Sequence, residues 1–335
     1  MATSGSTDFN QTRDQIIRSA LRKLGAISAG ETPDNQTIQD CSEALNMMVK
    51  AWSAKGIHLW TESEGILFLQ PNQIQYSLGP GSLDHCTQIQ PPNFVQSSIA
   101  SGAAQGATVL SLTTVTNILV GDHIGVTLDV GTVYWSTVTA VNPTAPFSVT
   151  IATGLPSSSG QTGTNNLVFD YTKDILRPLR IVDARLFTYA RPGADALETP
   201  MFPMSRLDYR DLPNKTVTGT PTSFFYDPQL NRGIIYVWPA PPNANDAVKF
   251  TWYRMIEDFD TASNNPDLPT EWLSTLVWGL AIEMAPEYDC NPQRYQMLKA
   301  EFMEKFDTVI SWDREPEPIY FGCSMDDNYS GGAGH

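Results

Sequence analysis

Two segments, Gly233-Ile-Ile-Tyr-Val-Trp238 and Val248-Lys-Phe-Thr-Trp-Tyr253, give the strongest strand signal in the chain. Both are rich in the β-branched and aromatic residues that favour strands. The three prolines from Pro239 to Pro242 lie between them, and proline cannot donate to a sheet ladder, so the connection must leave the sheet there. With Phe224-Phe225-Tyr226 just upstream, these segments predict consecutive antiparallel strands.

Strand-like sequence continues toward the N-terminus. Ile66-Leu67-Phe68-Leu69 ends at a Gln-Pro-Asn turn, and strand signals resume at Ile181, so we predict a β domain made of residues 61–94 and 171–255. Residues 95–170 are instead rich in Ser, Thr, Gly and Val and predict a small inserted all-β domain. Its expected strands are Thr108–Leu112, His123–Thr127, Thr132–Val138 and Phe147–Ile151.

The two ends of the chain have helical periodicity. Thr12-Arg-Asp-Gln15 has the form of a capping box, Gly25 suits a helix end, and Thr32-Pro33 suits the start of a second helix, so residues 1–60 predict a helical hairpin. Asp267-Leu-Pro269 and Asn291-Pro292 begin two further predicted helices within residues 256–311. We therefore predict an α+β multidomain fold. In it, an antiparallel α-helical bundle built from both ends of the chain is interrupted by a large β region and followed by an extended C-terminal arm, residues 312–335.

Charge is distributed unevenly along the 335 residues, whose formal net charge is −15. No Lys or Arg occurs from Gly56 to Thr172, and residues 256–335 carry 16 acidic against 4 basic side chains. Proteins that grip nucleic acid need clustered cations to displace counterions from phosphates. This composition therefore disfavours DNA gripping. No apolar run is long enough to span a membrane, and the first residues lack a secretory-signal pattern, so we expect a chain with free cysteines in a reducing cytosol.

The sequence contains no nucleotide-binding loop, zinc-ligand spacing or hydrolase motif, so we expect no catalytic residue, no metal and no cofactor. Its four histidines lie in unrelated contexts. The acid pairs Glu62/Glu64 and Asp258/Asp260 could serve glycoside hydrolysis in a cleft, but solvated acids are the expected interpretation. Arg177, Arg180, Arg185 and Arg191 alternate with aspartates, which favours ion pairing within or between subunits over phosphate binding.

Two helical stretches resemble the head-to-tail adaptor (tail accessory factor) family of short-tailed phages. The first is Ile16-Ile-Arg-Ser-Ala-Leu-Arg-Lys-Leu-Gly25 with the Ala51-Trp52 pair and Gly56-Ile57 after it. The second is Leu280-Ala281 with Ala285-Pro-Glu-Tyr288 and the helix that follows. The small members of that family lack most of the β region, so the resemblance marks it as a large insertion.

The resemblance implies a dodecameric ring beneath the portal protein, in the neck of the virion, that extends the DNA channel. Genomic DNA would pass through without sequence-specific binding, and the ring would contact tail hub, nozzle or fibre proteins. The C-terminal arm would bind the portal through Trp312, Pro316, Pro318, Tyr320, Phe321 and Tyr329. We expect ring contacts to use the charged residues Arg18, Arg22, Glu283 and Glu287. The alternatives are another tail component, such as a hub or receptor-binding protein, and a cell-wall hydrolase.

Overall fold

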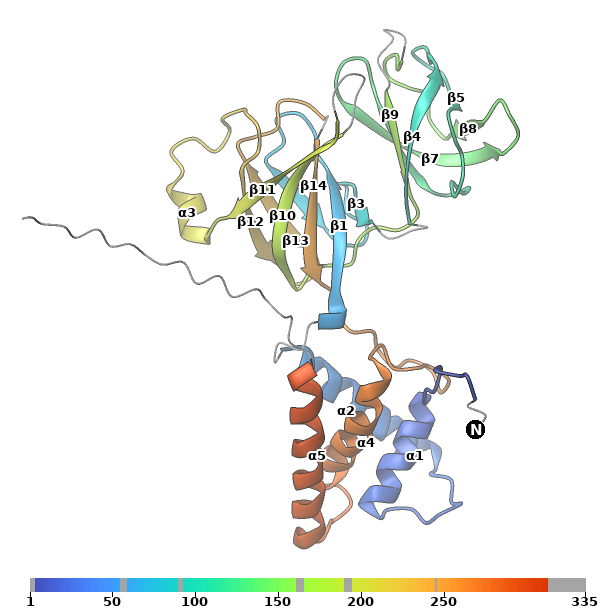
Figure 1. Ribbon diagram of the computed structural model, residues 1–335, viewed down its shortest axis with the longest axis vertical. Helices are drawn as coiled ribbons and strands as arrows, with labels where there is room; N and C mark the ends of the chain where they lie inside the picture. The colour runs from blue at the N-terminus through green and yellow to red at the C-terminus, as the bar shows by residue number, and fades with distance from the viewer. Residues whose placement is uncertain are drawn as a thin grey trace, which may run out of the picture. The chain divides into compact units, whose positions relative to one another are not determined.

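The computed structural model describes residues 4–54, 59–89, 93–160, 166–189, 195–244 and 246–312. The chain forms two compact units. One combines residues 1–59 with 259–335, and the other is residues 60–258. We call them the helical unit and the β unit (Figure 1).

The helical unit is formed by four packed helices from the two ends of the chain: α1 (Arg13–Leu24), α2 (Asn35–Ala54), α4 (Leu273–Met284) and α5 (Pro292–Trp312). Local sequence sets their ends. The Gln15 side chain accepts a hydrogen bond from the Thr12 N–H at 3.0 Å, and Gly25 ends α1 with a φ of 81°, a conformation that glycine adopts without strain.

Helix α4 is the centre of the helical unit. It follows a 3₁₀ turn (Thr270–Trp272) and buries most of its side chains against its three neighbours. The ring of Trp52 on α2 lies 5.7 Å from that of Trp272 and 5.3 Å from that of Phe306 on α5. Gly279 lets α2 approach, because a Cβ atom there would lie 2.7 Å from the sulfur of Met48.

The β unit contains an eight-stranded sheet in the order β2-β13-β12-β11-β10-β14-β1-β3. All neighbours are antiparallel except β11 and β12, and the short helix α3 (Arg206–Asp211) follows β11. A 3₁₀ turn (Leu59–Thr61) precedes the first strand. The bounds are β1 Glu62–Phe68, β2 Gln75–Leu78, β3 Cys86–Gln88, β10 Arg180–Thr188, β11 Leu197–Pro203, β12 Ser223–Pro228, β13 Gly233–Trp238 and β14 Asp246–Tyr253.

One face of this sheet is the main core of the β unit. Because side chains alternate along a strand, β14 turns Val248, Phe250 and Trp252 to this face. They share a buried cluster with Ile235 and Val237 of β13, so the two halves of the sheet fold over a common core. Every one of these side chains is almost completely buried.

Six further strands form a closed barrel in the order β4-β5-β8-β7-β6-β9. Closure leaves no free edge within it. Its interior is aliphatic, with Leu110, Ile124 and Val126 fully buried. Gly125 allows the Trp135 ring to lie against the neighbouring strand, where a Cβ would be 2.7 Å from the indole. The bounds are β4 Phe94–Ser101, β5 Val109–Leu112, β6 His123–Thr127, β7 Val133–Asn142, β8 Ser148–Ile151 and β9 Leu167–Tyr171.

The barrel packs on one half of the second sheet face through aromatic side chains. Ile66 and Phe68 of β1 share a buried cluster with Phe169 and Tyr171 of β9 and with Tyr189 after β10. The Phe68 ring lies 4.9 Å from Trp135 and 5.0 Å from Phe169. The other half of this face stays open.

The two edge strands of the sheet, β2 and β3, form hydrogen bonds with other segments of the same chain. The Ser77 N–H of β2 donates to Asp84 Oδ2 at 2.7 Å, and the Ser77 carbonyl accepts from Ser82. On β3, the Cys86 carbonyl accepts from the Ile175 N–H at 2.9 Å, and Thr87 Oγ1 donates to the Lys173 carbonyl. The backbone groups of Ser77 and Cys86 that are bonded in this way are not available to an added strand.

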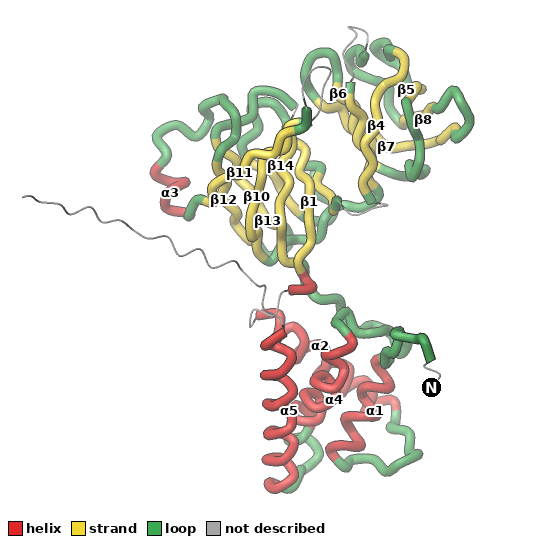
Figure 2. The backbone as a smooth tube through the Cα atoms, in the orientation of Figure 1, coloured by secondary structure: helices red, strands yellow, loops and turns green. Residues whose placement is uncertain are grey.

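The prediction of an antiparallel α-helical bundle as the basis of the fold is wrong. Among the described residues, fourteen strands outnumber five α-helices and hold more residues, so the protein is predominantly β (Figure 2). The β segments have two large hydrophobic cores of their own. They are therefore not a connecting segment between the helices of a bundle. A second error concerns β13 and β14, predicted as consecutive neighbours. Strand β14 pairs with β1 and β10, and β13 pairs with β12 and β2.

Candidate functional site

The open half of the second sheet face carries a row of charged side chains. In the register of the sheet, Glu64 of β1 lies opposite Thr251 of β14, and Thr251 lies opposite Asp183 of β10. Two residues earlier on β14, Lys249 lies opposite Arg185. All five side chains project to the same face because the side-chain period of a strand is two.

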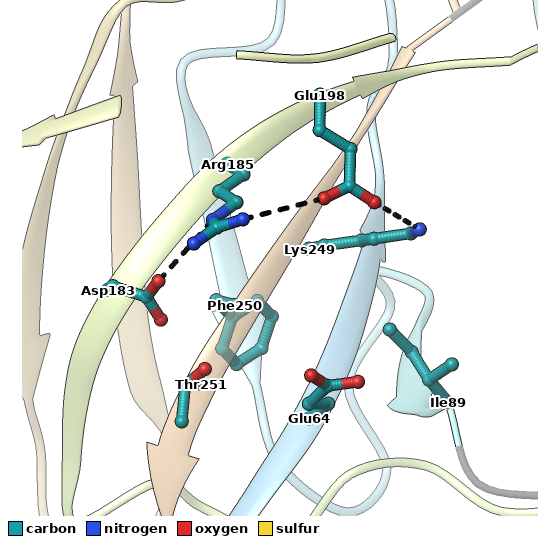
Figure 3. A pocket seen from close by; sticks show the side chains of 8 residues that line it. All are labelled: Glu64, Ile89, Asp183, Arg185, Glu198, Lys249, Phe250 and Thr251. Atoms are coloured by element: carbon teal, nitrogen blue, oxygen red, sulfur yellow. Dashed lines mark hydrogen bonds and ion pairs between the residues drawn. The ribbon is translucent and has the colours of Figure 1, made fainter. Parts of the chain in front are cut away.

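An ion-pair network crosses three strands at this place (Figure 3). Glu198 of β11 accepts from Lys249 at 2.7 Å and lies 3.8 Å from the Arg185 guanidinium. Arg185 also lies 3.6 Å from Asp183. The Lys249 ammonium covers the Phe187 ring at 3.6 Å, a favourable cation–π contact. A pocket of about 200 Å³ lies at this network. It is lined by Asp183, Arg185, Glu198 and Lys249 together with Glu64, Ile89, Phe250 and Thr251.

The pocket has one more carboxylate than it has cations. Its two cations, Arg185 and Lys249, are engaged with Asp183 and Glu198, whereas Glu64 has no ion-pair partner among the residues that the structure describes. Glu64 is also exposed. Such a site favours an incoming cation over an anion. In the described ranges, no group of His, Cys, Asp and Glu side chains has the arrangement of a metal site.

A second polar cluster lies where the barrel meets the sheet. The His85 ring, just before β3, stacks on Trp135 at 3.9 Å, and its Nδ1 lies 2.8 Å from the Tyr171 hydroxyl. That hydroxyl donates to Asp174 at 3.1 Å, so Nδ1 of His85 carries the proton. Burial, with a smaller effect of His123, lowers the pKa of His85 to about 4. The ring is therefore neutral near pH 7 and links the two sheets.

Asp122 and Asp170 form a buried acid pair in the barrel wall; each is 2% exposed. Burial raises the pKa of Asp170 to about 8, and the charge of Asp122 and a hydrogen bond to it add to the rise. Asp122 in turn accepts from the Leu119 N–H at 2.7 Å. The pair therefore holds a proton near neutral pH, as close carboxyl groups do in a low-dielectric site.

Comparison with known proteins now gives the class of protein. The family described as SU10 adaptor protein matches residues 138–319, more than half of the chain. The chain belongs to the SU10 adaptor family. No curated protein matches its sequence. None of the helices in the described part combines the length and the apolar character that a membrane crossing needs.

The adaptor is thus a structural phage protein, a component of the virion that interacts with other virion proteins. The match begins within β7 and continues through the sheet into α4 and α5. Most of the β region therefore belongs to the pattern of this family, and its description as a large insertion is not supported. The N-terminal stretch that carried part of the resemblance, residues 16–57, lies outside the match.

The residues predicted from the adaptor resemblance are placed only in part. Arg22 on α1, Glu283 in the last turn of α4 and Glu287 in the turn after it are exposed, while Arg18 is half-buried. Trp312 is the last residue of α5. The other predicted portal-binding residues lie outside the described residues: Pro316, Pro318, Tyr320, Phe321 and Tyr329.

Sequence reasoning was right about some polar residues of the adaptor and missed others. Arg185 pairs with Asp183 within the chain, as the alternating charges predicted. The statement that the histidines lie in unrelated contexts is wrong, because the rings of His85 and His123 lie 6.1 Å apart. The acid pair Asp122/Asp170 was not predicted either. It is formed by neighbouring strands that lie far apart in sequence, and no local signal could have revealed it.

Proposed function

We propose that this adaptor forms a ring between the portal and the tail, extends the DNA channel and provides the attachment for tail components. The observation that carries the proposal is the family match, because it covers parts of both compact units, residues 138–258 of one and 259–319 of the other. A protein that joins two assemblies needs separate surfaces for each, and two units can supply them.

The charge distribution supports a channel through which DNA passes without being held. Residues 256–335 carry 16 acidic and 4 basic side chains, and no cation occurs between Gly56 and Thr172. Acidic side chains repel phosphate at short range, and their approach to DNA releases none of the counterions condensed on it. Genomic DNA would therefore slide past the ring without sequence-specific binding.

Two sets of residues are proposed for the contacts of the ring. Arg18 and Arg22 on α1 are basic, and Glu283 and Glu287 near the end of α4 are acidic, so one copy can offer cations to the acids of the next. Contacts of two different surfaces can close into a ring. The segment after Trp312 combines prolines, acids and the aromatic residues Tyr320 and Phe321, which suits an anchor on the portal.

Electron microscopy of the chain mixed with its portal tests the proposal. The expected result is a twelve-fold ring on the portal face that points to the tail. A trimer that ignores the portal would instead indicate a fibre or receptor-binding protein. Hydrolysis of peptidoglycan that disappears in the variants Glu64→Gln or Asp258→Asn would replace the structural role with an enzymatic one.

A further inference from the structure

The pocket on the open sheet face has the properties of a receptor for a basic side chain. It holds Glu64 without a partner among the described residues, beside a network in which both cations are already paired. The bonded edges of the sheet argue against docking by an added strand at β2 or β3. A partner would therefore approach this face with side chains.

A projecting element with matching chemistry lies at the other side of the same sheet. Helix α3 exposes Leu207, which is 66% accessible, and Arg210 three residues later on the same helix face. Phe202 at the end of β11 is 70% accessible. No partner for the Arg210 guanidinium occurs among the described residues. Arg206, in contrast, is already paired with Asp227 and lies over the Phe225 ring.

Helix α3 is held firmly enough to present these side chains. Its first turn has a capping box in which Ser205 and Asp208 exchange hydrogen bonds at 3.0 and 3.1 Å. The Tyr209 ring stacks on Phe225 at 5.6 Å and lies tilted against Tyr236 at 4.8 Å. Lys215 donates to the carbonyls of Arg210 and Leu212 and so closes the other end. A prearranged surface loses little freedom on binding.

The two features cannot meet within one copy. Helix α3 packs on β12, and Glu64 belongs to β1, which lies four strands away in the sheet order β12-β11-β10-β14-β1. At the usual spacing of neighbouring strands, this corresponds to about 19 Å along the sheet. An arginine fixed to α3 by its backbone does not reach so far. Arg210 can therefore complete this pocket only in a neighbouring copy.

We propose that helix α3 of one copy docks on the Glu64 pocket of the next copy in the ring. Arg210 pairs with Glu64, and Leu207 covers the apolar rim that Ile89 provides. The contact joins two different surfaces, so it repeats from copy to copy and closes with the ring. It rests on the proposed ring and identifies a contact made by the β unit, in addition to that of the helices.

Charge reversal tests this contact directly. Arg210→Glu and Glu64→Arg each place like charges opposite one another, and each is expected to weaken association between subunits by ~10-fold or more. Combining both substitutions in one chain restores the opposite charges in reversed order and is expected to restore assembly. Association is measured by analytical ultracentrifugation of the free chain and by ring occupancy on portals in electron micrographs.

Arg232→Glu is the matched control, because Arg232 is also exposed, lies on the turn before β13 and gives the same change of net charge. It is expected to assemble like the unmodified chain. Thermal unfolding of the isolated subunits establishes that each variant is folded.

The outcomes separate this contact from the ring itself. If the unmodified chain forms rings and both single variants form them equally well, the proposed α3–Glu64 contact is excluded, and the proposed ring is not affected. The contact is also wrong if the double variant fails to recover while each single variant is folded. If the unmodified chain forms no ring on its portal, the proposed function fails first. If the single variants form rings but lose a tail component, the pocket receives that component and not a second copy.

Discussion

The ring of Phe68 on the sheet lies 4.9 Å from the ring of Trp135 on the barrel. Phe68 also contacts Phe94, Phe169 and Tyr171, so one side chain of β1 meets strands β4, β7 and β9 of the barrel. It is 3% exposed. This contact fixes the barrel to one half of the sheet face and leaves the other half, with its charged pocket, open to a partner.

Replacing Phe68 should therefore destabilise the β unit. Phe68→Ala removes a buried aromatic side chain and is expected to lower the free energy of unfolding by ~3–5 kcal/mol. Chemical denaturation monitored by tryptophan fluorescence measures the change. Leu230→Ala is the control, since Leu230 is 89% exposed and its truncation should change stability by less than about 0.5 kcal/mol. A loss below about 1 kcal/mol for Phe68→Ala would mean that the barrel is not held by this cluster.

The sequence predicted local features better than long-range ones. Thr12, Gly25 and Asn291 mark helix ends as expected, because caps depend on neighbours a few residues away. The predicted start at Thr32-Pro33 is wrong by a few residues: Asp34 Oδ1 accepts from the Thr37 N–H at 2.7 Å and begins α2. More than one polar side chain near the start of a helix can accept hydrogen bonds from its free N–H groups. The backbone path before the helix determines which of them does.

Strand order could not be predicted in the same way. Strand β14 pairs with β1, nearly two hundred residues earlier in the sequence, and β11 pairs in parallel with β12. Such pairings depend on shared cores, and periodicity within one strand does not contain them. The charged pocket likewise depends on long-range strand pairing. Glu64 was interpreted as a solvated acid and the aspartates near Arg185 as ion-pair partners of the arginines, and only the register through Thr251 brings Glu64 and Asp183 to one face.

The acid pair of the barrel predicts a stability that depends on pH. The pKa of Asp170 is about 8 in the folded state, against an ordinary 3.8. The folded state therefore holds a proton that the unfolded chain releases above pH 3.8, and stability falls as the pH rises from about 4 to about 8. The slope is at most ~1.4 kcal/mol per pH unit.

Asp170→Asn should remove this dependence, because the amide keeps a donor toward Asp122 and carries no proton to lose. The variant is expected to match the unmodified chain near pH 4 and to melt at a higher temperature at pH 8. Thermal melts across this range check the difference. Asp195→Asn, the same substitution at an exposed position, is the matched control. Parallel melting profiles for Asp170→Asn and the unmodified chain would show that Asp170 ionises normally in the folded protein.

Truncation of the C-terminal segment should separate folding from portal binding. Removing residues 313–335 deletes the proposed aromatic anchors and leaves every described helix and strand intact. The truncated chain should keep its melting temperature but no longer form rings on portals in electron micrographs. Tyr320→Ala combined with Phe321→Ala should reproduce most of the loss, whereas Asp326→Asn with Asp327→Asn should not. Undiminished joining by the truncated chain would exclude the segment as the anchor.

Isolated adaptor should not bind duplex DNA at physiological salt. The helical unit and the segment after it contain most of the excess acid, with 16 acidic and 4 basic side chains from residue 256 onward, and the barrel contains no Lys or Arg. Without clustered cations there is no counterion release to drive binding. Fluorescence anisotropy of a labelled duplex, with a basic DNA-binding protein as positive control, measures this. Submicromolar affinity that falls steeply with added salt would mean that assembly gathers the few arginines into a cationic surface. The ring would then hold the DNA instead of letting it slide.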